Sequence, residues 1–146
     1  MGLIQTLSSQ NVYFDANIFI YLLEGNDSYS QALSDITSLI ANNQVNVVCS
    51  DLVYTEMLPH HAKRNNHKAI EHIIDFLNHF KIVRISREIA IHAGVLRGET
   101  GMKTPDALHV ATAINQQCDI FLTNDAGIHT PSNMQRVLLS DFCDGK

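Results

Sequence analysis

The chain has 146 residues, of which 45% are hydrophobic and 17% are charged, with Gly 7 and Pro 3. This composition excludes a disordered, collagen-like or low-complexity protein, because the apolar surface is large enough to offset the entropy lost on folding. The formal net charge of −5 argues against a simple polybasic nucleic-acid binder. We therefore expect one soluble globular domain over residues 1–146.

The cysteines and the apolar runs indicate where such a protein functions. Cys49, Cys118 and Cys143 are far apart and form no CxxC pair. This spacing favours reduced thiols over a disulfide framework or a zinc site. The first ten residues lack the positive charge of a signal peptide, and no apolar run approaches the roughly 20 residues of a membrane span. We expect a cytoplasmic protein without a membrane partner.

Five short runs rich in β-branched and aromatic residues predict strands. They lie at residues 11–14, 45–49, 82–85, 119–123 and 136–139, and the last is expected at an edge of the sheet. The inner runs are too apolar to alternate with polar residues, which is typical of parallel strands covered on both faces.

Helical patterns separate these strands. Apolar residues recur at helical spacing over residues 32–40, 70–80 and 89–96, and Ser86 is the expected N-cap of the third pattern. A further helix is predicted to start at Thr104 and Pro105, with Thr104 as the cap. This alternation predicts an α/β fold, a three-layer α/β/α sandwich with a mostly parallel central sheet.

Four acidic residues are predicted at one edge of this sheet. Asp15 and Asp125 follow the first and fourth strands, Glu56 lies about one turn into the helix after the second, and Asp106 lies in the first turn of the helix that starts at Thr104. Ligands of open parallel sheets bind beyond the carboxyl ends of the strands. Four carboxylates there would repel one another without a counter-charge, and oxygen ligands suit Mg²⁺ or Mn²⁺ better than zinc.

Each acid also has an ordinary structural explanation. Asp106 could favour the helix dipole, and Asp125 could be part of a turn in Thr-Asn-Asp-Ala-Gly. Asp15 is the hardest to explain in this way, because it lies between two apolar runs with no basic residue nearby in sequence. Taken together, the four acids favour a metal site.

The histidines do not predict a zinc site. The chain has eight, but His72 and His79 are seven positions apart and no pair has the i, i+4 spacing of a helical zinc site. His109 lies about one turn after Asp106. It could hydrogen-bond into the pocket or be an ordinary core histidine, and we favour the second interpretation.

Four segments carry a resemblance to a known family. These are YFDANIFIYLL (13–23), TEML (55–58), TPDALHVATA (104–113) and FLTND (121–125). They resemble the PIN-domain nucleases, and most closely the VapC-type toxins of bacterial and archaeal toxin–antitoxin pairs. The resemblance extends over residues 11–141. It implies a PIN-like fold and Mg²⁺- or Mn²⁺-dependent cleavage of RNA.

The resemblance also implies roles for particular residues. The catalytic and metal-binding pocket would be formed by Asp15, Glu56, Asp106 and Asp125, supported through hydrogen bonds by Asn17 and Thr123. Glu56 could bind the metal directly or through water, or position the attacking water. The candidates for phosphate contacts are Lys103 and Arg97, and beyond them Arg84 and Arg87. The implied partners are an RNA substrate, a small antitoxin protein and a second copy of the chain in a homodimer.

The resulting hypothesis is a metal-dependent endoribonuclease that hydrolyses RNA phosphodiester bonds as the toxin of a toxin–antitoxin pair. A non-catalytic PIN-fold interaction module and a housekeeping nuclease are the alternatives, and DNA stays open as a substrate. Loss of a pocket acid would indicate the interaction module, but all four acids are present. A receiver-like phosphoacceptor would need a lysine after a late strand, where this chain has Thr-Asn-Asp and Ser-Asp.

Overall fold

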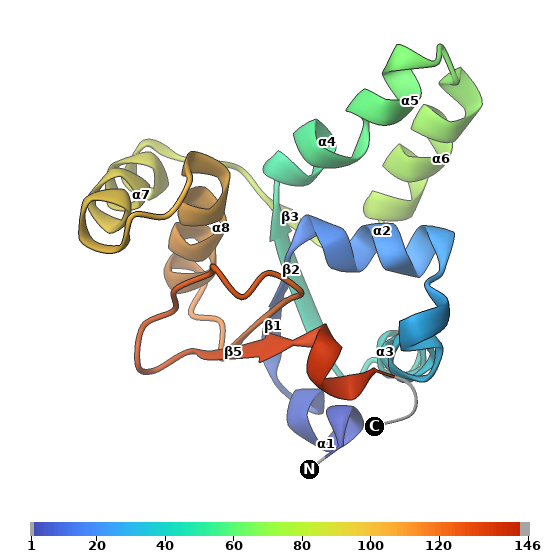
Figure 1. Ribbon diagram of the computed structural model, residues 1–146, viewed down its shortest axis with the longest axis horizontal. Helices are drawn as coiled ribbons and strands as arrows, with labels where there is room; N and C mark the ends of the chain where they lie inside the picture. Colours follow the sequence, from blue (N-terminus) through green and yellow to red (C-terminus); the bar gives the residue numbers. More distant parts are fainter. Residues whose placement is uncertain (1, 144–146) are drawn as a thin grey trace.

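The computed structural model, which describes residues 2–143, contains a five-stranded sheet in which all strands are parallel (Figure 1). The strand order is β3-β2-β1-β4-β5, so β5 lies at an edge, as predicted. The strands are β1 (Asn11–Phe14), β2 (Asn46–Ser50), β3 (Lys81–Val83), β4 (Ile120–Thr123) and β5 (Gln135–Leu138). The predicted α/β sandwich is confirmed.

Eight α-helices occur in the described residues, and none of them is long and apolar enough to cross a membrane. They are α1 (Leu3–Leu7), α2 (Ala16–Glu24), α3 (Ser30–Ala41), α4 (Leu52–Met57), α5 (Pro59–Lys63), α6 (His67–Leu77), α7 (Arg87–Thr100) and α8 (Thr104–Asn115), with 3₁₀ turns η1 (Asp27–Tyr29) and η2 (Leu139–Phe142). Helices α7 and α8 cover one face of the sheet, whereas α2 and α3 lie on the other (Figure 1).

Alternate residues of the central strand β1 enter different cores. Val12 and Phe14 pack with α1, α2 and α3, whereas Tyr13 packs with α7 and α8. The Tyr13 ring stacks on Phe121 of β4, with the ring centroids 5.1 Å apart. All four side chains are fully buried. Burial on both faces explains why the strand residues are apolar without alternation.

Three local features differ from the sequence predictions. Helix α2 was not predicted, because its short and nearly continuous apolar sequence is compatible with a buried strand as well as with a helix. Strand β3 ends at Val83, two residues early, because the chain must reach Ser86, which caps α7. Thr104 is already helical, and the extended residue before α8 is Lys103, which makes no side-chain cap.

Candidate metal-binding site

Asp15 lies at the carboxyl end of β1 and is held there by two protein donors. As the N-cap of α2, it accepts a hydrogen bond from the backbone N–H of Ala16 at Oδ1 (2.8 Å). Its Oδ2 accepts from the hydroxyl of Thr123, at the end of β4 (2.7 Å). Asp15 is only 5% exposed, so these two bonds fix the orientation of a buried carboxyl group.

Thr123 links Asp15 to Asp125. The Thr123 hydroxyl oxygen accepts from the backbone N–H of Asp125 (3.0 Å), and Asp125 Oδ1 accepts from the N–H of Gly127 (2.8 Å). Arg136 of β5 donates to the carbonyl oxygen of Ala126 (2.7 Å) and so holds this loop against the sheet. The turn interpretation of Asp125 and its position at the pocket are therefore compatible.

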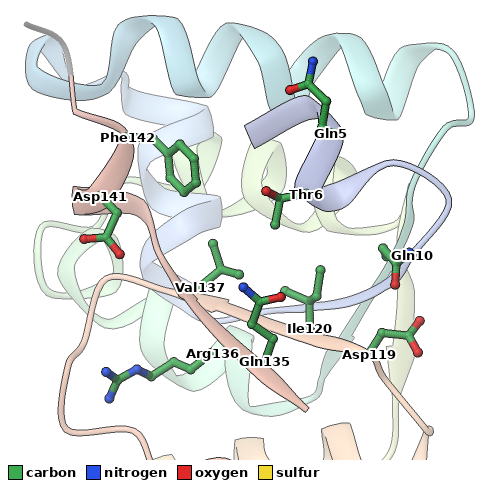
Figure 2. A pocket seen from close by; sticks show the side chains of 10 residues that line it. All are labelled: Gln5, Thr6, Gln10, Asp119, Ile120, Gln135, Arg136, Val137, Asp141 and Phe142. Atoms are coloured by element: carbon green, nitrogen blue, oxygen red, sulfur yellow. The ribbon is translucent and has the colours of Figure 1, made fainter. Parts of the chain in front are cut away.

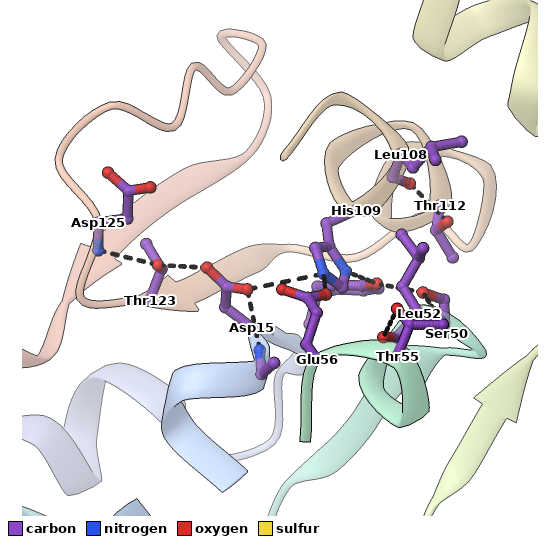
Figure 3. A network of polar contacts seen from close by, with 12 residues as sticks. Asp15, Ser50, Leu52, Thr55, Glu56, Leu108, His109, Thr112, Thr123 and Asp125 are labelled. Carbon is purple, nitrogen blue, oxygen red and sulfur yellow. Dashed lines mark hydrogen bonds and ion pairs between the residues drawn. The ribbon is translucent and has the colours of Figure 1, made fainter. Parts of the chain in front are cut away.

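Glu56 and His109 complete the tightest part of the site. Glu56 lies on α4 with its side chain 32% exposed, and its Oε1 is hydrogen-bonded to Nε2 of the fully buried His109 of α8. The same Nε2 is 3.7 Å from Asp15 Oδ1. One ligand atom from each of these three residues lies within 4.8 Å of the others (Figure 3). The prediction of an ordinary core histidine was therefore incomplete, because His109 is buried and also contacts the acids.

Asp106 lies in the first turn of α8 and is half-buried. Burial raises its pKa above the ordinary value of 3.8, and the negative charges of Asp125 and Asp15 raise that pKa further. Asp106 and Asp125 line a common cavity of about 260 Å³. Burial also raises the pKa of Asp15, against the opposing effects of His109, Thr123 and Ala16. The structure thus brings the four acids to one edge of the sheet, where burial and neighbouring carboxylates disfavour the ionised forms of Asp15 and Asp106.

The available donors suit a hard divalent cation. Carboxylate oxygens are the ligands that Mg²⁺ and Mn²⁺ prefer. Asn17, in the first turn of α2, has a buried side-chain oxygen to which no group of the described residues donates a hydrogen bond. Buried polar atoms are almost always paired, so this oxygen is suited to accept a hydrogen bond from a water, and a supporting role of Asn17 at the pocket stays a prediction. A cation would also neutralise the repulsion that raises the pKa of Asp106.

The two leading candidates for phosphate contacts, Lys103 and Arg97, have different surroundings. Lys103 is exposed and lines the same cavity as Asp106 and Asp125. Arg97 donates from Nε to the carbonyl oxygen of Met102 (3.3 Å), so it holds the turn between α7 and α8. Phosphate contacts by these two residues stay predictions.

A larger cavity, of about 490 Å³, lies apart from the acidic cluster (Figure 2). Ile120 and Gln135, at the starts of β4 and β5, line it together with residues of α1 and η2. Asp119 also lines it, and its carboxylate accepts from the backbone N–H of Asn11 (2.9 Å). This cavity is therefore at the amino ends of the strands, opposite the edge at which open parallel sheets bind ligands.

Solved structures with the same fold are numerous, and three illustrate the likeness. A toxin–antitoxin complex from Klebsiella pneumoniae is 24% identical, with 88% of this chain and 98% of that chain covered and a TM-score of 0.66. VapBC2 from Rickettsia felis, bound to a DNA fragment from its promoter, is 22% identical, with coverages of 87% and 97% and a TM-score of 0.65. VapC20 from Mycobacterium tuberculosis, described as a sarcin-ricin loop cleaving toxin, is 16% identical, with coverages of 76% and 87% and a TM-score of 0.57.

At these identities the structures establish the fold, and family membership rests on the sequence. No curated protein matches the chain significantly. The family model of the PIN domain matches residues 12–132. This range includes all four acids of the candidate site, together with Asn17, Thr123 and His109. The chain therefore belongs to the PIN domain family.

Proposed function

We propose that this protein is a divalent-metal-dependent endoribonuclease that hydrolyses RNA phosphodiester bonds and is the toxin of a toxin–antitoxin pair. The observation that carries the proposal is the convergence of Asp15, Glu56, Asp106 and Asp125 at the carboxyl edge of the sheet. Among the described residues, no lysine or arginine forms an ion pair with any of them. A cluster of acids without a lysine or arginine partner is suited to a cation.

The four acids divide into two roles. Asp15, Asp106 and Asp125 would ligate the metal, and Glu56 would ligate it directly or through water, or orient the attacking water. When bound, Mg²⁺ or Mn²⁺ lowers the pKa of a bound water and neutralises charge on the phosphoryl oxygens.

Neighbouring groups hold these carboxylates in place. The Thr123 hydroxyl and the Ala16 N–H fix the rotamer of Asp15, because each bonds a different oxygen of its carboxylate. The unpaired oxygen of Asn17 is available to accept a hydrogen bond from water. Pre-oriented carboxylates need little reorganisation when the substrate binds.

Lys103 is the best-placed basic residue for the substrate. Its position beside Asp106 and Asp125 would let its ammonium group contact a phosphate next to the one being cleaved. Because the whole chain carries a net charge of −5, such a local cation and the bound metal would supply the attraction for a polyanion. The description of the similar VapC20 as a sarcin-ricin loop cleaving toxin supports RNA as the substrate class.

Two of the similar structures are toxin–antitoxin complexes, which supports a small antitoxin as a partner of this chain. A homodimer is the expected oligomeric state. Light scattering coupled to size-exclusion chromatography measures that state directly, and a monomeric mass would contradict it.

The proposal is tested by incubating the protein with total RNA and Mg²⁺ or Mn²⁺, beside reactions with EDTA. Asp106→Asn is the test variant. Asp75→Asn is the matched control, because it removes the same charge from an exposed position of α6. We expect internal cleavage by the wild type and by Asp75→Asn, and loss of at least about 100-fold in rate with EDTA or Asp106→Asn, more than the loss of an outer-shell partner causes. Cleavage that survives both EDTA and the Asp106→Asn substitution would refute the metal site. Absence of cleavage by the wild type with metal bound would indicate an interaction module.

A second assay tests the toxin role. Induced expression in a bacterial host should arrest growth with the wild type and with Asp75→Asn, but not with Asp106→Asn. Metal-dependent cleavage in vitro without growth arrest would indicate a housekeeping nuclease. Single-stranded DNA of matched sequence, added to the cleavage assay, determines whether the protein distinguishes the two nucleic acids.

A further inference from the structure

A chain of buried hydrogen bonds runs behind the acidic cluster from the sheet to Glu56. The hydroxyls of Ser50, at the end of β2, and Tyr13, in β1, are 3.0 Å apart. The Tyr13 hydroxyl is 2.6 Å from Nδ1 of His109, and Nε2 of that ring is bonded to Glu56. Ser50, Tyr13 and His109 are all 0% exposed. Water therefore does not compete for the bonds among these three residues.

The surroundings of the imidazole ring determine where its proton lies. Nε2 faces the carboxylates of Glu56 and Asp15. Ionised carboxylates only accept hydrogen bonds, so Nε2 must carry a hydrogen to be attracted to them. In the neutral ring Nδ1 is then an acceptor, and the hydroxyl of Tyr13 donates to it. The Tyr13 hydroxyl lies within donating distance of both Ser50 Oγ and His109 Nδ1 and has one hydrogen, so donation to Nδ1 requires Ser50 to donate to Tyr13.

Glu56 needs such a donor more than Asp15 does. Asp15 is buried and has a protein donor on each of its oxygens. Glu56 has a longer side chain, lies on the six-residue helix α4 and is 32% exposed. Ordering a long, partly exposed side chain costs conformational entropy, which a favourable contact with a fixed partner offsets. His109 comes from α8, on the other side of the site, and its fully buried ring is held by Tyr13 at Nδ1 (Figure 3).

We propose that His109 is a positioning residue: its Nε2–H, fixed in that tautomer by Tyr13, orients the Glu56 carboxylate toward the bound cation, and His109 is not itself a metal ligand. This proposal rests on the function proposed above, since it assigns Glu56 to the metal site. A ligand role would require a bare Nε2, whose lone pair would face two carboxylates.

Three variants separate this role from a structural one. His109→Gln keeps an N–H donor near the position of Nε2, whereas His109→Leu fills a similar volume without one. Both variants remove the acceptor of Tyr13, so both should lower the thermal midpoint of unfolding. We expect the Mn²⁺ dissociation constant of His109→Gln to stay within about threefold of the wild type, and that of His109→Leu to rise about 10–100-fold, as for other outer-shell partners. Equal affinities in the wild type and His109→Leu would overturn the proposal.

Tyr13→Phe tests the tautomer in a protein that keeps His109. It should weaken Mn²⁺ binding severalfold in the wild-type background but not in the His109→Gln background, which has no second ring nitrogen to fix. The same change in both backgrounds would show that Tyr13 acts independently of His109. This comparison stays informative if His109→Leu does not fold.

Two spectroscopic measurements do not depend on activity. In the metal-free protein, the ¹⁵N shifts of His109 should show a protonated Nε2, and a bare Nε2 would overturn the proposal. In the protein loaded with one equivalent of Mn²⁺, electron spin echo envelope modulation should show no directly coordinated nitrogen. A directly coordinated imidazole nitrogen would instead make His109 a ligand.

The wild-type protein distinguishes failure of this inference from failure of the proposed function. If the wild type neither binds Mn²⁺ nor cuts RNA, the proposed function and this inference are both wrong. If the wild type binds the metal and cuts RNA while His109→Leu does so equally well, only the role of His109 is wrong.

Discussion

The substitution Asp106→Asn should stabilise the metal-free protein but destabilise the protein in the presence of metal. The side chain of Asp106 makes no hydrogen bond within the described residues, so asparagine of nearly the same shape breaks no contact. Without metal, the variant loses an ionised group whose pKa is raised by burial and by Asp125 and Asp15. Because Asp106 is only half-buried, solvent screens much of this repulsion, and we expect the variant to be more stable by about 0.3–1 kcal/mol.

The sign changes when the cation binds. At a Mn²⁺ concentration 100-fold above its dissociation constant, binding stabilises the wild type by about 2.7 kcal/mol, and a variant without the ligand loses most of that gain. For a chain of this length, 1 kcal/mol shifts the midpoint of thermal unfolding by roughly 2–4 °C. Asp106→Asn should therefore melt about 1–3 °C above the wild type in EDTA and about 4–8 °C below it in Mn²⁺.

Thermal unfolding followed by circular dichroism, in EDTA and in MnCl₂, measures both differences. Asp75→Asn is the control and should follow the wild type in both buffers. The electrostatic reasoning fails if Asp106→Asn is destabilised by more than about 1 kcal/mol in EDTA, which would indicate a structural carboxylate. The assignment of Asp106 as a ligand fails if Mn²⁺ stabilises the variant and the wild type equally.

Three further predictions concern pH, salt and thiols. In EDTA, the stability of the wild type relative to Asp106→Asn should fall as the pH rises above about 3.8, because a raised pKa means that the folded state holds the Asp106 proton more tightly than the unfolded chain does. Urea titrations from pH 3.5 to 7 measure this difference in stability, and a difference that does not depend on pH would contradict the prediction. Lys103→Ala should weaken binding to single-stranded RNA and reduce the slope of log K against log salt by about 0.7, whereas Lys81→Ala, at the start of β3, should leave the slope unchanged. Of the three free thiols, only Cys143 should react quickly with Ellman's reagent in the native protein, because burial raises the pKa of Cys49 and Cys118 to about 12. Fast reaction of all three thiols would show that the core opens readily.

The amino-acid sequence was sufficient for the architecture and for the acids of the candidate site. Strands β1, β2 and β4 are buried on both faces of the sheet, so nearly all of their residues must be apolar, and such apolar runs can be recognised in the sequence alone. Asp15 and Asp125 could be placed because Asp15 directly follows β1 and Asp125 comes two residues after the end of β4, and parallel strands end at the same edge of the sheet. In both cases the information is local, since it lies within a few residues of the feature that it predicts.

The role of His109 was decided only by the tertiary structure. In the sequence it is a polar residue with mostly apolar neighbours, and this pattern fits an ordinary core histidine as well as it fits a residue of the site. Its partners Tyr13 and Glu56 are 96 and 53 positions away. Helix α2 likewise could not be assigned from the sequence, because a short, nearly continuous apolar run fits a buried strand or a buried helix, and its packing against the sheet decides between them. Contacts between distant segments depend on the order of the strands in the sheet, so neither spacing nor composition encodes them directly.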